Sequence, residues 1–166
     1  YFSERFLETV TTKEIIKMSD PKDCSYLFFK NTVVKVKKSG GYELMEYKDL
    51  PSTIWSTQIM DREFKKIDKK TSRSEFEQFL YNTVGRDDDK LLAISSAIGY
   101  LLHRYKDKSV TKAIVLMDEA IDSEPEGRTG KSLIGKAISY FRESVRIDSK
   151  NFAFGDKFTF QQINPS

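Results

Sequence analysis

The sequence predicts a mixed α/β fold in three parts, and three patterns support that prediction. Residues 1–73 contain short β-rich runs divided by turn residues, which is typical of a small β-meander with helices beside it. Residues 74–110 carry apolar side chains at helical spacing. Residues 111–166 begin with an apolar run, continue through a loop that contains glycines, and return to helical spacing. This third part is therefore expected to be a strand–loop–helix unit.

The composition is that of a globular protein. Of the 166 residues, 39% are hydrophobic and 32% are charged, and the net charge is +3. This small excess of positive charge permits a nucleic-acid partner without arguing strongly for one. Cys24 is the single cysteine, so the chain has no internal disulfide framework and no cysteine metal cluster. Because His103 is the single histidine, histidine-rich metal sites are nearly excluded.

The sequence predicts neither a membrane span nor a secretory signal. No apolar stretch approaches the roughly 20 residues that cross a bilayer, and no signal-peptide pattern opens the chain. We therefore expect a cytoplasmic protein without a membrane partner. The chain begins with Tyr1 rather than methionine, so we expect it to be a piece of a longer protein.

The first part is expected to start with helices and continue as a three-stranded meander. Residues 1–19 have amphipathic spacing, and Thr11 with Glu14 fits a capping box for a second short helix. Residues 25–48 then read as three short strands. Turn residues separate these strands at two places, Asn31–Thr32 and Ser39–Gly41.

The meander is followed by two apolar anchors and a charged stretch. Trp55 and Ile59 are expected to pack the meander onto the rest of the domain. Residues 61–74 hold six cations and three carboxylates, so a solvated loop or linker is at least as well supported as a DNA surface. The cations are Arg62, Lys65, Lys66, Lys69, Lys70 and Arg73. In the meander, Lys35, Lys37 and Lys38 are more typical of a solvated sheet face than of phosphate contacts.

Two helices are expected in the middle of the chain. Residues 74–84 place their apolar side chains on one face, and Gly85 ends the helix. Residues 88–105 form a longer apolar helix whose N-terminal aspartates suit its dipole. His103 lies in the last turn, where capping the helix is a better explanation than catalysis.

The third part carries the one motif with defined chemistry. Residues 112–117 predict a strand and are followed by Asp118-Glu119, and Gly127-Arg128-Thr129-Gly130-Lys131-Ser132 then opens a helical pattern. A phosphate-binding loop requires this order of strand, glycine loop and helix, because glycines let backbone N–H groups converge on a phosphate at a helix N-terminus. The two acids are expected near the nucleotide, without a catalytic role.

Extended segments are expected at 144–147 and 152–160.

Such a loop assigns a role to each of its residues. Lys131 would reach the β- and γ-phosphates of ATP and is the candidate catalytic residue, and the Ser132 hydroxyl would hold Mg²⁺. The other nucleotide-binding candidates are Gly127, Arg128, Thr129 and Gly130. The full pattern also requires a glycine at position 125, where this chain has Pro125.

Residues 87–134 resemble a known family. The Leu91–Leu102 segment, the predicted strand at 113–117 and the Gly127–Ser132 loop look like the start of the core of phage- and plasmid-type primase-helicases of helicase superfamily III. Phe28–Val34 and Tyr47–Leu50 look like the region ahead of that core. The resemblance implies a partial P-loop NTPase core of the AAA+ kind, from a parent that forms a homo-oligomeric ring and translocates on DNA during replication.

The same resemblance implies that part of the catalytic machinery lies outside this chain. The Walker B acids, the sensor residue and the arginine finger of that family follow the phosphate loop. Because phosphoryl transfer needs metal coordination, water positioning and charge stabilisation together, this chain is expected to bind ATP and Mg²⁺ but to hydrolyse ATP poorly or not at all. Two alternatives stay open: a non-enzymatic DNA- or protein-binding module, and another P-loop NTPase or kinase.

Overall fold

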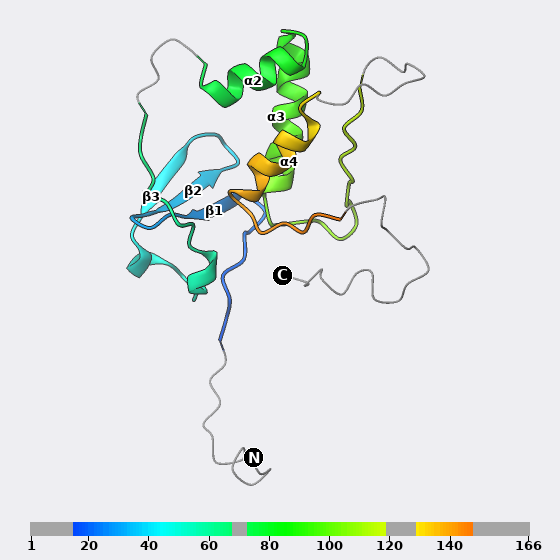
Figure 1. The fold of residues 1–166 in the computed structure, drawn as a ribbon. Coiled ribbons are helices and arrows are strands. Elements are labelled where there is room, and N and C mark those ends of the chain that lie inside the picture. Colours follow the sequence, from blue (N-terminus) through cyan, green and yellow to red (C-terminus); the bar gives the residue numbers. More distant parts are fainter. Residues whose placement is uncertain (1–14, 68–72, 119–128, 148–166) are drawn as a thin grey trace, which may run out of the picture. The chain divides into compact units, whose positions relative to one another are not determined.

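A computed structural model of the chain describes residues 15–67, 73–118 and 129–147 (Figure 1). The described residues contain both a small antiparallel sheet and α-helices, which confirms the mixed α/β class. The Thr11–Glu14 capping box and the extended segment predicted at 152–160 lie outside the described residues. Residues 15–19, where the helix after Thr11 was predicted to continue, are described and are not helical, so this part of the prediction is wrong. The backbone of this stretch pairs with Thr53 instead, through Met18 N–H at 2.9 Å and the Ile16 carbonyl at 3.3 Å.

The chain divides into two compact units, and each is built from two separate stretches. The first unit combines residues 1–68 with 103–111, and the second combines 69–102 with 112–166. The first unit is therefore discontinuous in sequence, because the chain leaves it, builds part of the second unit and then returns.

The first unit contains the predicted three-stranded meander. Strands β1 (Cys24–Phe28), β2 (Val33–Lys37) and β3 (Tyr42–Met45) pair antiparallel in the order β1-β2-β3. The turn between β2 and β3 places Gly40 at φ 93° and Gly41 at φ 77°, a left-handed conformation that glycine adopts without steric cost. Local turn chemistry thus sets the register of this sheet.

One face of the sheet forms the hydrophobic core of the unit. Tyr26, Phe28 and Val33 are buried together with Met18, and Val33 is fully inaccessible to solvent. Ile59 is half-buried against this cluster, as predicted. Alternate residues of a strand point to opposite faces, so the residues between these core positions lie on the other face.

Two 3-10 turns follow β3: η1 (Tyr47–Asp49) and η2 (Ser56–Gln58). Trp55 precedes η2 and is 47% exposed, so the prediction that it packs in the core is wrong. The Lys17 ammonium lies 5.4 Å from the centre of its ring, a cation–π contact suited to a half-exposed indole.

A buried carboxylate joins the returning segment to the sheet. Asp20 is buried and accepts hydrogen bonds from the Ser25 hydroxyl at 2.7 Å, the Tyr26 amide at 2.9 Å and the Arg104 amide at 3.0 Å. A buried carboxylate needs such donors to offset its loss of hydration. Asp20 therefore ties β1 to a residue that lies 84 positions later in the chain.

His103 takes part in the same junction. Its Nε2 atom lies 3.0 Å from the Pro21 carbonyl oxygen and 3.2 Å from the Cys24 carbonyl oxygen. Carbonyl oxygens only accept hydrogen bonds, so Nε2 carries the proton. Helix α3 ends before this residue, at Leu102. The prediction that His103 caps that helix is therefore wrong, because its ring bonds the start of β1 instead.

In the second unit, α2 (Glu75–Thr83) follows the predicted pattern. The Ser74 hydroxyl accepts a hydrogen bond from the Glu77 amide at 3.2 Å, which caps the helix N-terminus. Gly85, at φ 72°, follows the last turn and ends the helix in the left-handed conformation.

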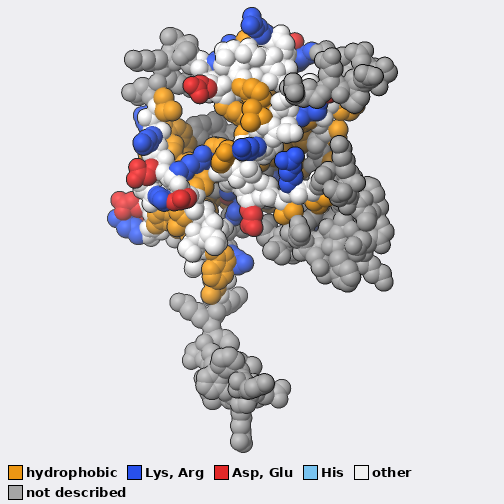
Figure 2. Space-filling model, in the orientation of Figure 1, with side chains coloured by type: hydrophobic (Ala, Val, Ile, Leu, Met, Phe, Trp, Pro, Cys, Tyr) orange, Lys and Arg blue, Asp and Glu red, His pale blue; other side chains and the backbone are white. Residues whose placement is uncertain are grey.

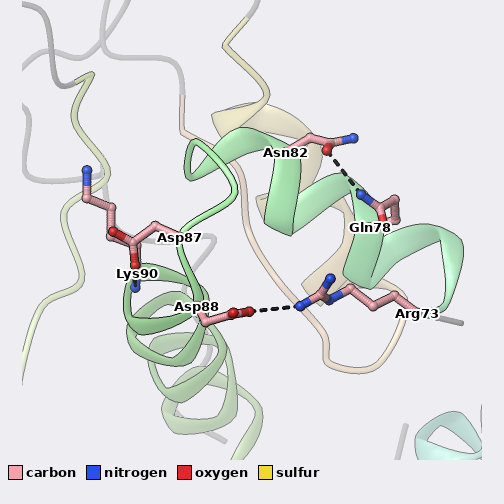
Figure 3. A network of polar contacts seen from close by, with 6 residues as sticks. All are labelled: Arg73, Gln78, Asn82, Asp87, Asp88 and Lys90. Carbon is pink, nitrogen blue, oxygen red and sulfur yellow. Dashed lines mark hydrogen bonds and ion pairs between the residues drawn. The ribbon is translucent and has the colours of Figure 1, made fainter. Parts of the chain in front are cut away.

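Helix α3 (Asp88–Leu102) begins close to α2. The Arg73 guanidinium donates to the Asp88 carboxylate at 2.8 Å, and the Asp87 carboxylate accepts from the Lys90 amide at 3.0 Å (Figure 3). Along α2, Gln78 donates to Asn82 at 3.0 Å. The contacts of Asp87 and Asp88 lie at the start of α3, whereas the contact between Gln78 and Asn82 lies within α2. All three are exposed, so each contributes little to stability.

The strands predicted in the third part are absent from the described residues. Residues 111–118 and 143–147 have no assigned strand, so the predictions of strands at 112–117 and 144–147 are wrong. The apolar composition of 112–117 favours β structure, but a strand also requires a neighbour that pairs with its backbone. Within the described ranges, Val115 and Met117 are each 74% exposed.

The described helices include none that is long and apolar enough to cross a membrane.

Candidate functional site

The candidate site lies at the N-terminus of α4 (Lys131–Ser139) in the second unit. Gly130 precedes the helix at φ 88°, and its carbonyl accepts hydrogen bonds from the amides of Leu133 at 3.0 Å and Ile134 at 3.2 Å. No side chain of the described residues caps this helix. The first amides of an α-helix have no partner within it, so this end is suited to an anion.

Position 130 requires glycine for two reasons. Its positive φ is unfavourable for any residue with a Cβ atom. In addition, a Cβ at this position would lie 2.8 Å from Cζ of Phe79 and 3.7 Å from Oγ1 of Thr83. Close packing against α2 therefore fixes the backbone immediately before Lys131. The burial of Ile134 one turn later holds the same end of α4 in place.

The Lys131 ammonium contacts two oxygen atoms. It is paired with Oδ2 of Asp118, and it donates to Oγ1 of Thr129 at 2.6 Å. The side chains of Lys131 and Asp118 are 37% and 35% exposed, so water and small ions can reach the pair. Hydrogen bonding from Lys131, and secondarily from Thr129, lowers the pKa of the Asp118 carboxyl below its ordinary range. At neutral pH, the anion beside Lys131 is thus a carboxylate of the protein itself.

The structure describes four of the six predicted site residues. Thr129, Gly130, Lys131 and Ser132 lie together at the start of α4, whereas Gly127, Arg128 and also Glu119 lie outside the described residues. Ser132 is exposed on the first turn. The direct pairing of Asp118 with Lys131 was not predicted from the sequence. Its only signal in the sequence is its place directly after the apolar run.

The oxygen atoms at this site suit Mg²⁺ better than a softer metal. The carboxylate of Asp118 and the hydroxyl of Ser132 are hard donors of the kind that Mg²⁺ prefers. The described residues include no group of three or more His, Cys, Asp or Glu side chains that could hold a metal ion. A magnesium ion here would therefore depend on the phosphates of a ligand for most of its coordination.

A shallow depression of about 610 Å³ lies at the polar end of the sheet in the first unit. It is lined by Lys35, Lys37, Lys38, Asp23, Cys24 and Ser39. Its cations already have acidic partners, since Lys35 and Lys37 pair with Glu43, and Lys38 pairs with Asp23. This depression is a weaker anion site than the start of α4.

No protein-family model matches this chain, and neither a curated protein nor a solved structure shows significant similarity to it. The relationship to superfamily III helicases therefore stays a prediction. The local chemistry around Lys131 is therefore the observation from which a function can be argued.

Proposed function

We propose that the start of α4 binds the phosphates of ATP together with Mg²⁺, and that the chain is the nucleotide-binding part of a replicative DNA helicase or primase-helicase. One observation carries the first half of this proposal. The Lys131 ammonium is held beside the N-terminus of α4 by an anionic and a hydroxyl oxygen, those of Asp118 and Thr129. A phosphate oxygen has the charge and the hydrogen-bonding capacity to replace the carboxylate.

The exchange of carboxylate for phosphate has a clear driving force. A triphosphate carries more charge than one carboxylate, and it accepts hydrogen bonds from Lys131 and from the first amides of α4 at the same time. Ser132 and the released Asp118 are then available to a magnesium ion bound to the phosphates. When bound, Mg²⁺ neutralises charge on the β- and γ-phosphates.

The second half of the proposal rests on the resemblance of residues 87–134 to superfamily III helicases. In a longer parent protein of this family, Lys131 would act in phosphoryl transfer within an oligomeric ring on DNA. The matching experiment is an ATPase assay of the parent with and without DNA. Stimulation by DNA supports a helicase, whereas ATP consumption that does not respond to DNA favours another P-loop NTPase or a kinase.

A second candidate is a non-enzymatic binding module, and one observation favours it. Residues 111–118 do not pair as a strand in the described structure, although a phosphate-binding loop normally follows a strand of a parallel sheet. In this alternative, the pair of Lys131 and Asp118 is only a structural contact at a helix start.

Binding of a fluorescent ATP analogue in the presence of Mg²⁺ separates these two candidates. Lys131→Ala removes the charge-assisted hydrogen bonds and is expected to weaken binding roughly 10- to 100-fold. Lys136→Ala is the matched control, because Lys136 lies in the last turn of the same helix, and it is expected to bind as the wild type does. Absence of binding in the wild-type chain, or equal binding in all three proteins, contradicts the nucleotide proposal.

A further inference from the structure

The first unit carries an exposed aromatic and apolar sheet face that the proposed nucleotide site does not use. The register pairs Val36 with Tyr42 and Val34 with Leu44. These residues alternate with the core residues, so they lie on the face opposite the hydrophobic core. Val36, Tyr42 and Leu44 are 40%, 46% and 53% exposed, whereas Val34 is only 4% exposed. The exposed part of this face is therefore a strip formed by Val36, Tyr42 and Leu44.

A second aromatic ring extends this face beyond the sheet. The ring of Phe64 packs edge-on against Tyr42, with centroids 5.7 Å apart, and against Phe29, with centroids 5.4 Å apart. Asn31 fixes the backbone of Phe64 through two hydrogen bonds: its amide nitrogen donates to the Phe64 carbonyl at 3.0 Å, and its amide oxygen accepts from the Phe64 N–H at 2.8 Å. Phe64 and Tyr42 therefore form a preorganised aromatic pair.

The segment that supplies Phe64 also supplies positive charge. The Arg62 guanidinium lies 5.6 Å from the centre of the Phe29 ring, and Lys65 and Lys66 directly follow Phe64 and are exposed. Of the neighbouring acids, Asp61 is paired with Lys30. Glu63 is exposed between Arg62 and Phe64, so residues 62–66 carry three cations and one carboxylate. Figure 2 shows basic, acidic and hydrophobic side chains intermixed on the drawn face. Aromatic rings and cations occur together here within a few residues of one another.

We propose that this surface, made of Val36, Tyr42, Leu44, Phe64 and the cations of residues 62–66, binds single-stranded nucleic acid. Unpaired bases stack on aromatic side chains without strong preference for sequence, while lysine and arginine neutralise the backbone phosphates. A duplex keeps its bases stacked on one another, so it gains only the phosphate contacts. The combination of the exposed Tyr42 ring, the half-buried Phe64 ring and adjacent cations thus favours a single strand over a duplex, and over an uncharged apolar protein partner. The residues of this surface belong to the first unit and Lys131 belongs to the second, so this proposal does not rest on the nucleotide site.

Fluorescence anisotropy with labelled oligonucleotides of about one site size, roughly 16 nucleotides or fewer, tests the proposal. The wild-type chain is expected to bind oligo-dT or oligo-rU more tightly than a duplex of equal length, and the two single strands show whether DNA or RNA is preferred. Tyr42→Ala is expected to weaken single-strand binding roughly tenfold. Tyr42→Phe keeps the stacking ring and is expected to retain binding. Tyr140→Ala, at an exposed tyrosine of the second unit, is the matched control.

A second pair of substitutions tests the electrostatic part of the surface. Replacing Lys65 and Lys66 by glutamine is expected to weaken binding and to reduce the slope of log affinity against log salt by roughly 1.4, about 0.7 for each phosphate that is no longer neutralised. Lys136→Gln, at an exposed cation of the second unit, is expected to leave oligonucleotide binding unchanged. The proposal is overturned if the wild-type chain binds no single strand, if it prefers the duplex, or if Tyr42→Ala binds as the wild type does. Self-association through this face without oligonucleotide binding would identify a protein interface instead.

Discussion

At the scale of single residues, the candidate site depends most on Gly130, which joins a loop to α4 at a positive φ. Gly130→Ala is expected to destabilise the second unit by about 1–3 kcal/mol, because the new Cβ is strained at this φ and meets the Phe79 ring. Gly135→Ala is the control: no atom lies within 4 Å of its added Cβ, and alanine in mid-helix is expected to stabilise by about 0.5–1 kcal/mol. Urea denaturation measures both. Equal stability of the two variants would contradict the close approach of α2 to α4.

Asp118 gives a second prediction at this scale. Because Lys131 lowers the pKa of its carboxyl, the carboxylate stays ionised until the pH falls below the ordinary aspartate value of about 3.9. The ion pair therefore contributes above this pH and is lost in acid. Carbon-13 NMR of the Asp118 carboxyl in Lys131→Ala is expected to show its pKa rising toward the ordinary value. In Lys136→Ala the titration should match that of the wild type. An unchanged pKa in Lys131→Ala would mean that the two side chains do not pair in solution.

At the scale of elements, strand β1 makes the first unit sensitive to alkali. Burial, with smaller contributions from Cys24 and nearby carboxylates, raises the pKa of Tyr26 to about 12. Because the pKa is raised in the folded state, the contribution of Tyr26 to the free energy of unfolding is fully present below the tyrosine pKa of the unfolded chain, about 10. This contribution is lost as the pH rises toward 12. The expected loss is about 2–3 kcal/mol.

Thermal denaturation between about pH 9 and pH 12 measures this effect. Tyr26→Phe cannot ionise, so its stability is expected to fall less steeply with pH than that of the wild type, even if its stability at neutral pH is lower. Tyr42→Phe removes an exposed tyrosine hydroxyl and is expected to keep the steep decline. Parallel declines in the wild type and in Tyr26→Phe would assign the alkaline sensitivity to another group.

The elements that could be predicted from the sequence are those whose causes are local. Gly40 and Gly41 specify the turn between β2 and β3, and Ser74 and Gly85 mark the ends of α2 within its own turns. Contacts over long distances in the sequence could not be predicted this way. Residues 112–117 have a strand-like composition, but pairing depends on a neighbour that composition does not reveal.

In the candidate site, too, the local features could be predicted from the sequence and the long-range contact could not. Its loop and helix are contiguous, so Thr129 to Ser132 could be identified from the motif. The pairing of Lys131 with Asp118 spans 13 residues and includes a stretch whose conformation no periodicity specifies. The apolar character of Trp55 likewise predicted that it packs in the core. Composition does not show that Lys17 lies over its ring, a contact suited to a half-exposed indole.

At the scale of the whole molecule, the feature that matters most is the return of residues 103–111 to the first unit. The chain passes from one unit to the other three times, after residues 68, 102 and 111, so the first unit is incomplete until α2 and α3 have been made. Asp20 and His103 hold the returning segment against the start of β1. Stability of the sheet therefore depends on residues about 80 positions away, which makes its folding slower than that of an isolated meander.

Asp20→Ala is expected to separate the returning segment from the sheet. Three donors lose their buried acceptor, two of them backbone amides, and an unsatisfied buried donor costs about 1–3 kcal/mol. We expect the first unit to lose about 2–4 kcal/mol and the Arg104 amide to lose its protection from hydrogen exchange. Asp23→Ala, which removes an exposed carboxylate paired with Lys38, is expected to change neither quantity appreciably. If the Arg104 amide stays protected in Asp20→Ala while β1 loosens, the returning segment is held by other contacts, and Asp20 stabilises only its own strand.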